Sequence, residues 1–481
     1  MSEWTTDDLT ALKITGATDD EMRTIRRLLS VWRERLQRNQ QRSMYYDGDQ
    51  AFKDLGLALP PQLKNAKFYL GWATQAVRKP AARSQFEGFR LPGVKDPFEL
   101  NTILEQNRFG LEFSQATVDA GKHGMALTTV AKGGSGEPDV QIQAHSVESS
   151  SAIWNRRRRW IEAALTISEL NKDANPTEFI VYLDNVILHC SKADGTWKAE
   201  RTPNQIGRTL VVPVPHDPQL KKPFGRSRIT PPVMALTDMA VRAYVRMEGN
   251  AEFYSTPQLA VEGIDPDAFD GDVNEQRKFK LAMDRLIALT RDADGNAPTI
   301  KQLQQATMQP HSDMLRTVAM AFAGETGIPA HSLGILHDQP ASAEAIRAGE
   351  HDLLVDVSYQ NKYVLSQAAA DQARLAVMVR DGLTEPPKES WNLSVRFADP
   401  EFRSTTANAV GFTQLAGAVP DLVYSDVMLE TVFDSDQVER LQEYRTRATA
   451  GDSLRALLNG GADKGAPDGV EGGPGGVQAS E

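Results

Sequence analysis

The chain has 481 residues, 41% of them hydrophobic and 24% charged, which is the balance of a soluble globular protein with about two to four domains. Its formal net charge is -11, from 53 lysines and arginines against 64 aspartates and glutamates. Tight nonspecific binding of nucleic acid is therefore disfavoured, because that affinity comes mainly from cations that neutralise phosphates.

Membrane insertion and disulfide chemistry are also disfavoured. No apolar run approaches the ~18 residues that a spanning helix needs. The acidic N-terminus MSEWTTDDLT lacks the basic-then-apolar order of a signal peptide, which predicts folding in the cytoplasm. The only cysteine, Cys190, allows neither an intrachain disulfide nor a cysteine-based zinc site. We expect it to be a half-buried strand residue.

The N-terminal part of the chain is predicted to be helical. Thr18 and Glu21 have the spacing of a capping box, and apolar residues follow at helical intervals. We therefore expect a helix over 19–43 that ends before the turn YYDGDQ. Asp96 and Pro97 are typical of an N-cap and a first helical position. Further helices are expected over 64–79, 97–108 and 110–121.

Short alternating segments separated by turn residues begin at Met125. They predict an antiparallel β meander over about 125–214. The run Arg156–Arg159, flanked by Trp154 and Trp160, lies where a loop enters one of these strands. We interpret it as a strand edge with alternating exposed arginines. Two other roles stay open: contact with nucleic acid through phosphates and stacking, and salt bridges between subunits.

The second half of the chain returns to helical spacing. An amphipathic helix is expected over 232–253, and Ser312 is expected to cap a helix that ends at Gly327. No proline interrupts the pattern from Ala343 to Arg380, which predicts one helix of roughly 57 Å at ~1.5 Å per residue. Strands are expected at 257–261, 299–305 and 391–402, further helices at 279–289 and 405–458, and a disordered Gly-rich tail at 459–481.

The segment AHSLGILHD, residues 330–338, contains the residue types of a serine hydrolase. A nucleophile elbow needs Gly-x-Ser-x-Gly after a strand. Ser332 instead has Ala330 at the first position of that pattern and follows a helix that ends in proline. We therefore interpret His331, Ser332 and His337 as polar loop residues.

Other catalytic and metal signatures fail as well. The sequence contains no P-loop and no His-Glu-x-x-His. The segment 292–296 starts like a calcium loop, but Ala297 and Leu303 stand where Gly and a bidentate Glu are required, so a turn is predicted there. No cofactor, metal ligand or catalytic residue is predicted.

Five short motifs follow one another along the chain. They are Tyr45-Tyr46-Asp47-Gly48 after an arginine-rich helix, Phe224-Gly225-Arg226-Ser227-Arg228-Ile229, Gly327-Ile328-Pro329 with Leu333-Gly334, Ala341-Ser342-Ala343-Glu344-Ala345-Ile346, and Phe397-Ala398-Asp399-Pro400. Their order resembles that of the portal proteins of tailed double-stranded-DNA bacteriophages. The resemblance covers about residues 20–455.

This resemblance implies a mostly helical α+β portal fold, with an antiparallel β meander in a wing, two stem helices, a small α/β clip, one very long helix and a helical crown. Carried over by position, the parts are the wing at 1–228, stem helices at 229–254 and 311–327, the clip at 255–310, a tunnel loop at 328–342, the long helix and wing return at 343–400, the crown at 401–458 and the tail at 459–481.

The resemblance also implies a structural function without a catalytic site. About twelve copies would form a ring at one capsid vertex, around a channel through which double-stranded DNA enters in packaging and leaves in ejection. Such a ring belongs to the virion and assembles in the host cytoplasm. The implied partners are viral DNA, the terminase large subunit, major capsid and scaffolding proteins, and head-completion or adaptor proteins.

Candidate site residues follow from the same positions. The tunnel loop is expected to face DNA with His331, Ser332, Leu333, His337, Asp338 and Gln339, the stem contributes Arg242, Arg246 and Arg316, and the clip meets terminase or an adaptor with Asp292, Asp294 and Asn296. An acidic ring would let DNA slide, because each neutralised phosphate adds affinity. Two alternatives stay open: a serine-type hydrolase or nucleic-acid-processing enzyme, and a non-portal oligomeric scaffold of the capsid.

Overall fold

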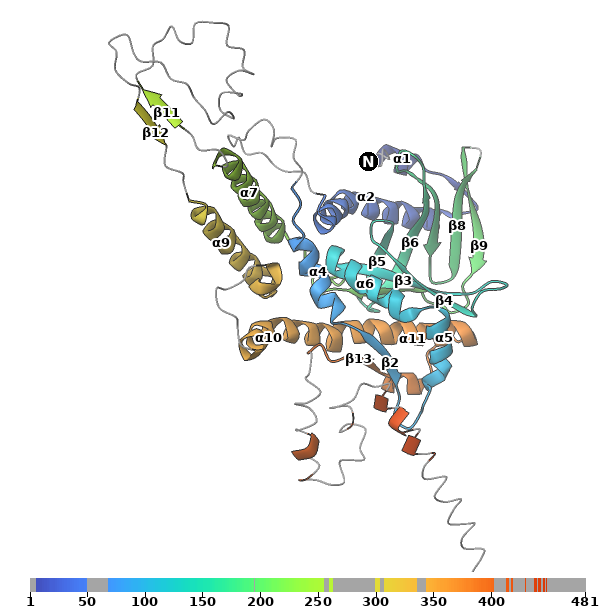
Figure 1. Ribbon diagram of the computed structural model, residues 1–481. Coiled ribbons are helices and arrows are strands. Elements are labelled where there is room, and N and C mark those ends of the chain that lie inside the picture. The colour runs from blue at the N-terminus through green and yellow to red at the C-terminus, as the bar shows by residue number, and fades with distance from the viewer. Residues whose placement is uncertain are drawn as a thin grey trace, which may run out of the picture. The chain divides into compact units, whose positions relative to one another are not determined.

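The computed structural model describes residues 6–49, 68–193, 195–254, 259–262, 299–302, 307–334 and 343–401, together with isolated residues between 412 and 447. The chain divides into two compact units, 1–400 and 401–481, so nearly all of the described structure belongs to the first. Helices and strands are mixed in it (Figure 1), as the sequence predicts. Within the described parts, no helix is long and apolar enough to cross a membrane.

Helix α2 (Asp19–Asp47) starts at the predicted capping box. The Thr18 backbone N–H donates to Glu21 Oε2 at 2.8 Å, and the Glu21 N–H donates to Thr18 Oγ1 at 3.4 Å. The predicted end before YYDGDQ is wrong, because the helix continues to Gly48, which has φ 80°. Tyr45 is only 3% exposed, so packing of its ring extends the helix beyond its amphipathic pattern.

The next helices begin and end differently from the prediction. Helix α4 spans Trp72–Ala82, whereas a start at 64 was expected; residues 68–71 are not helical and 64–67 lie outside the described residues. The helix expected over 97–108 is broken. The 3-10 turn η1 (Pro97–Glu99) precedes α5 (Leu100–Gln106), with φ 56° at both Phe98 and Glu99. Helix α6 (Phe109–His123) follows.

Two side chains account for this break. Asp96 Oδ1 accepts the backbone N–H of Asn101 at 3.1 Å, so the aspartate serves the later helix and not the turn that directly follows it. The Phe98 carbonyl accepts from Arg380 at 2.6 Å. Long-range contact therefore fixes a backbone conformation that local propensity disfavours.

The predicted meander divides into two sheets. One has the order β1-β9-β8-β7-β6-β5 and the other β10-β3-β4. All their pairs are antiparallel except β1 with β9. The strands are β1 (Ile14–Thr15), which follows α1 (Thr6–Ala11), β3 (Met125–Lys132), β4 (Val140–His145), β5 (Ser150–Asn155), β6 (Trp160–Leu170), β7 (Pro176–Tyr182), β8 (Val186–Ala193), β9 (Thr196–Pro203) and β10 (Val211–Pro215).

Helix α2 packs on the six-stranded sheet. Its Ile25, Leu28 and Leu29 share a fully buried cluster with Phe179 of β7 and Cys190 of β8. Cys190 is therefore completely buried, and the expectation of half burial is wrong. Helix α2 covers the face of the sheet on which Cys190 lies. Burial raises the pKa of the Cys190 thiol to about 12.

The run Arg156–Arg159 is not a strand edge. Asn155 and Trp160 face each other as the last pair of β5 and β6, so the arginines form the turn of this hairpin. Strand pairing ends before the run, which corrects the prediction, and the arginines are exposed.

A helix and an antiparallel strand pair are described in the next segment. Helix α7 spans Pro231–Tyr254, and strands β11 (Leu259–Glu262) and β12 (Thr299–Gln302) pair with each other. The helix predicted at 279–289 lies outside the described residues. Helix α9 (Gln309–Thr326) ends at Gly327, as predicted, but Ser312 lies inside it and does not cap it. The helix starts earlier because Pro310 already has the φ that a first turn requires.

The predicted uninterrupted helix from 343 is divided. It contains α10 (Ala343–Tyr359), a π-helical segment η4 (Gln360–Leu365) and α11 (Ser366–Asp381). After the 3-10 turn η5 (Lys388–Asn392), strand β13 (Ser394–Phe397) pairs with β2 (Phe86–Arg90). Helices α6 and α11 cover the three-stranded sheet, with Phe113 and Leu375 in one core with Val130.

Candidate functional site

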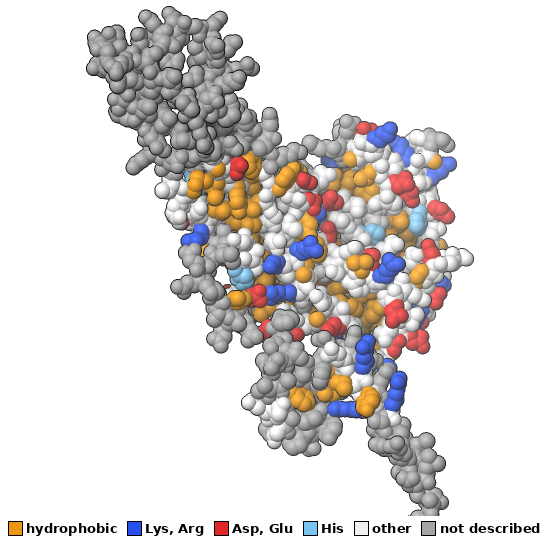
Figure 2. All heavy atoms as spheres, viewed as in Figure 1, with side chains coloured by type: hydrophobic (Ala, Val, Ile, Leu, Met, Phe, Trp, Pro, Cys, Tyr) orange, Lys and Arg blue, Asp and Glu red, His pale blue; other side chains and the backbone are white. Residues whose placement is uncertain are grey.

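Helices α7 and α9 lie side by side and share one apolar core (Figure 1). Phe322 of α9 is fully buried, with its ring centroid 5.3 Å from that of Trp72 in α4. The described residues do not cover the opposite faces of the two helices. Met239, Tyr244 and Met320 are 37%, 40% and 53% exposed, and Figure 2 shows hydrophobic side chains gathered over α7. The pair is thus anchored to α4 on one side and presents apolar side chains on another.

The predicted stem arginines lie on this pair. Arg242 and Arg246 are half-buried on α7, and Arg316 is exposed on α9. An Arg246 Nη atom lies 3.7 Å from Met314 Sδ of the facing helix. Of these arginines, Arg316 has the guanidinium most accessible to a ligand.

The FGRSRI motif joins the sheets to α7 by a tightly packed turn. Gly225 has φ 83°, and a Cβ there would lie 2.1 Å from the His216 carbonyl oxygen and 2.5 Å from that of Gly124. The Ser227 hydroxyl donates to the Lys122 carbonyl at 2.6 Å and accepts the Ile229 N–H at 2.9 Å. The glycine and the serine are therefore fixed by sterics and hydrogen bonding.

Arg228, the next residue of the motif, connects three helices. Its Nε donates to the Ala76 carbonyl of α4 at 2.7 Å, one Nη to the Thr326 carbonyl of α9 at 2.6 Å, and the other to Asp356 Oδ2 of α10 at 2.7 Å. The Arg228 side chain is 10% exposed, whereas that of Asp356 is 53% exposed.

Both carbonyls that Arg228 contacts lack a helical donor. The residue four positions after Ala76 is Pro80, which lies inside α4 and has no N–H to donate. Thr326 is the last residue of α9, whose terminal carbonyls have no intrahelical partner. One guanidinium therefore satisfies two orphan acceptors while it ties α9 to α4 and α10.

The segment after α9 is a 3-10 turn, η3 (Ala330–Leu333). Leu333 is only 8% exposed and packs in the core of the α7/α9 pair, so its predicted position facing DNA is wrong. Its side chain is the apolar anchor of this turn. His331 is partly exposed, with Nε2 3.9 Å from Glu350 Oε1. The other predicted loop residues, His337, Asp338 and Gln339, lie outside the described residues, as do the clip residues Asp292, Asp294 and Asn296.

The turn does not assemble hydrolase geometry. The Ser332 N–H donates to the Pro329 carbonyl at 2.9 Å, and the Ser332 side chain is half-buried. No side-chain bond joins Ser332 to a histidine in the described part of the chain. No group of three potential metal ligands occurs among those same residues.

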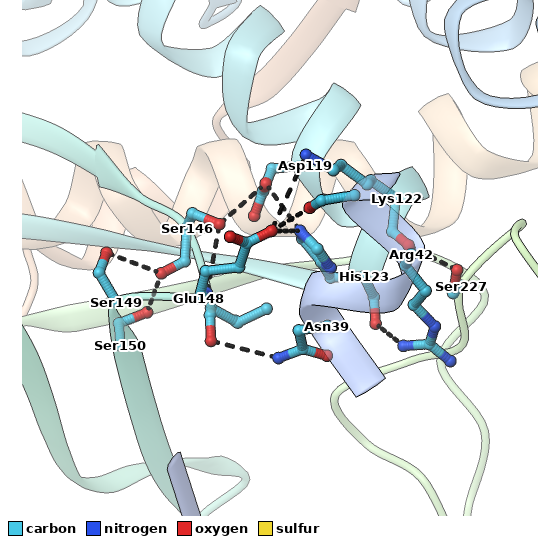
Figure 3. Close-up of polar contacts among 12 residues, drawn as sticks. Asn39, Arg42, Asp119, Lys122, His123, Ser146, Glu148, Ser149, Ser150 and Ser227 are labelled. Carbon is cyan, nitrogen blue, oxygen red and sulfur yellow. Dashed lines mark hydrogen bonds and ion pairs between the residues drawn. The ribbon is translucent and has the colours of Figure 1, made fainter. Parts of the chain in front are cut away.

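A polar cluster around one buried histidine supports the junction that the FGRSRI motif forms between the sheets and α7, and it was not predicted (Figure 3). We call it the His123 cluster; its members are Ser43, Asp119, Lys122, His123, Ser146 and Glu148. The His123 side chain is fully buried, with Nε2 3.3 Å from Glu148 Oε1 and 3.5 Å from Asp119 Oδ1. The Ser43 hydroxyl donates to Glu148, and that of Ser146 to Asp119 at 3.0 Å.

The two carboxylates of the cluster have opposite pKa shifts. The hydrogen bond with His123 lowers the pKa of Glu148 to about 2. Burial raises the pKa of Asp119, despite the nearby His123. The cluster fixes the end of α6 to α2, where Arg42 donates to the His123 carbonyl at 2.7 Å. The FGRSRI motif is hydrogen-bonded to the same end of α6. By fixing that end of the helix, the cluster also fixes the junction. Its residues are far apart in sequence, and only the acid at position 119 and the histidine at 123 have a spacing that predicts contact.

Comparison with known proteins gives a consistent answer. A family model described as phage portal protein, SPP1 Gp6-like, matches residues 25–448. The portal protein of Mycobacterium phage D29 is 27% identical over 404 residues, which are 81% of each chain. That of Mycobacterium phage L5 is 28% identical over 389 residues, which are 78% of this chain and 77% of the relative.

Solved structures are also similar to this chain. A chain in the neck of a native gene transfer agent particle, computed with C12 symmetry, has a TM-score of 0.41 and 12% identity to this chain. The match covers 89% of that chain and 77% of this one. A chain in the virion of that particle has a TM-score of 0.39 and 13% identity, with 87% and 74% covered.

Proposed function

Since the chain belongs to the SPP1 Gp6-like family of phage portal proteins, we propose that it forms a ring of about twelve copies at one vertex of the phage head. Double-stranded DNA passes through this ring in packaging and ejection. The role is structural, and the work of moving DNA comes from a separate ATPase, the terminase. Terminase and, later, head-completion proteins bind the ring at the clip, residues 255–310.

The uncovered apolar side of the α7/α9 pair carries this proposal. Met239, Tyr244 and Met320 are exposed on two helices whose other faces are buried. Exposed apolar surface on a folded unit marks a contact site, and a closed ring supplies that contact because each copy meets its neighbour through different faces. We assign α7 and α9 to the stem on this ground.

The remaining parts keep their predicted places in the proposal. The wing comprises 1–228 with much of 343–400, and the crown comprises 401–458. Arg228, the last residue of the wing, holds the end of α9 against α4 and α10. The loop 328–342 connects α9 to α10, and we propose that His331 and Ser332, with Arg316 of the stem, face the channel.

Single-particle imaging of the purified full chain tests the proposal. We expect closed rings of about twelve copies around a pore wide enough for duplex DNA; a ring of thirteen also supports it. A monomer or a closed dimer at assembly concentrations would overturn it. Met320→Glu, which introduces charge into the exposed side of α9, should prevent ring closure without unfolding the monomer. Glu105→Lys, on α5 in another region, is the control and should leave rings intact.

A further inference from the structure

The turn between β5 and β6 is preformed. Asn155 Oδ1 accepts the backbone N–H groups of Arg157 and Arg158 at 3.1 and 3.0 Å, and its carbonyl accepts the Arg159 N–H at 2.8 Å. Arg159 has φ 57°. One asparagine thus holds the backbone of four consecutive arginines, which we call the hairpin tip (Arg156–Arg159).

One arginine of the tip is used internally. Arg158 pairs with Asp184 at 3.0 Å and lies 5.5 Å from the centroid of the Trp160 ring. Arg208 also lies over that ring, at 4.9 Å. Trp154, the other flanking aromatic residue, packs edge-on against Phe224 at 5.7 Å. Both tryptophans are therefore occupied, and neither is a platform on which an unpaired base could stack.

The other arginines of the tip have no internal use. Arg156, Arg157 and Arg159 are exposed, and their guanidinium groups make no ion pair or hydrogen bond with the described residues. The chain as a whole has 64 acidic residues against 53 basic ones, so acidic partners are abundant elsewhere. Like charges on neighbouring residues repel each other. A rigid turn that concentrates uncompensated arginines is suited to an external anion.

The surroundings of the tip favour a polyanion over a protein. Protein interfaces have an apolar or aromatic centre. Among the described residues, the large hydrophobic side chain that is exposed in the β5–β6 hairpin is Leu170, at the end of β6 away from the tip. Interfaces with DNA are more positively charged, and most of their bonds go to phosphates. Arginine binds phosphate in a bidentate manner.

We propose that the hairpin tip binds the phosphate backbone of duplex DNA, without sequence preference, through Arg156, Arg157 and Arg159. This contact is separate from the α7/α9 pair. It rests on the proposed function only in taking DNA as the polyanion that the protein meets. Because the chain has a net charge of -11, binding should be weak and should appear mainly at low salt.

Fluorescence anisotropy with a labelled DNA duplex tests this proposal on the full chain over a series of salt concentrations. We compare Arg156→Ala/Arg157→Ala/Arg159→Ala with Arg156→Lys/Arg157→Lys/Arg159→Lys, which keeps the charge. The control is Arg27→Ala/Arg35→Ala/Arg38→Ala, which removes the same charge from exposed positions of α2.

Each lost phosphate contact lowers the slope of log affinity against log salt by about 0.9. We therefore expect the magnitude of that slope to be smaller by about two to three in the alanine variant of the tip. The lysine and control variants should keep the slope of the wild type. Equal weakening by both alanine variants, or no change in either, would overturn the proposal. Loss of ring assembly in the tip variant alone would also overturn it, because the tip would then be a contact between copies.

These outcomes are separable from those of the proposed function. If the wild-type chain forms no ring but loses DNA affinity only when the tip is changed, the portal proposal fails and the tip proposal stands. If rings form and the tip variant binds DNA as the wild type does, the tip proposal fails and the portal proposal stands.

Discussion

Replacement of Arg228 by alanine should destabilise the protein by about 2–6 kcal/mol. The change leaves two buried carbonyl oxygens, those of Ala76 and Thr326, without a donor, and an unsatisfied buried acceptor costs about 1–3 kcal/mol. The third contact adds little, because Asp356 is 53% exposed and exposed ion pairs contribute about 0–1 kcal/mol. Urea unfolding of the full chain, followed by far-UV circular dichroism, measures the difference.

Two further variants make this test specific. Asp356→Asn removes only the exposed ion pair and should cost below about 1 kcal/mol. Pro80→Ala supplies the N–H that α4 lacks at this turn, so the Ala76 carbonyl gains a helical donor. In that background, Arg228→Ala should cost about 1–3 kcal/mol less, which a double-mutant cycle detects. The reasoning is refuted if Arg228→Ala costs no more than Asp356→Asn, or if the cycle shows no coupling to Pro80.

The remaining predictions concern the junction, the cluster behind it and the turn after α9. Glu148 has a folded-state pKa of about 2 against 4.5 ordinarily, so its contribution to stability is present above pH 4.5 and is lost as the pH falls towards 2; thermal unfolding of Glu148→Gln should show a shallower loss over that window, and an unchanged profile contradicts the assignment. Gly225→Ala should prevent folding, because its Cβ meets two carbonyl oxygens, whereas Gly207→Ala, with φ 73° and no neighbour within 4 Å, should cost only about 1–2 kcal/mol; equal soluble yields would argue against the steric reason. Leu333→Ala should destabilise by about 2–5 kcal/mol and Ser332→Ala by under about 0.5 kcal/mol; the opposite order of unfolding midpoints would refute the burial of Leu333.

Local sequence signals predict individual helices and strands better than they predict which of these elements contact each other. The capping box at Thr18 fixes the start of α2, and the αL glycine after α9 fixes its end, because both depend on residues within one turn. The break at Phe98 could not be predicted, because its carbonyl is held by Arg380, far along the chain. Likewise, the β pattern of 125–214 predicts strands but not their division into two sheets, since alternation does not specify which strands pair.

At the candidate site, too, the sequence predicts local motifs but not the long-range contacts that their side chains make. The FGRSRI motif could be identified from sequence, but the use of Arg228 could not, because its acceptors lie at residues 76, 326 and 356. Loop position suggested that Leu333 was accessible, whereas its apolar side chain is buried against α7 and α9. The arginine run is visible in the sequence, but only the structure shows that Arg158 pairs with Asp184 and that the other three guanidinium groups have no partner among the described residues.

The pairing of β2 with β13 has a consequence for synthesis of the chain. Ser394 donates to the Arg90 carbonyl across a separation of 304 residues, and Phe397 joins Phe86 and Phe113 in one aromatic group. Until β13 leaves the ribosome, β2 has an unpaired edge and these rings lack their last partner. Such edges promote association between nascent chains. Correct folding of the first unit is therefore completed late, after most of the polypeptide has been translated, and chains that stop before Ser394 should aggregate.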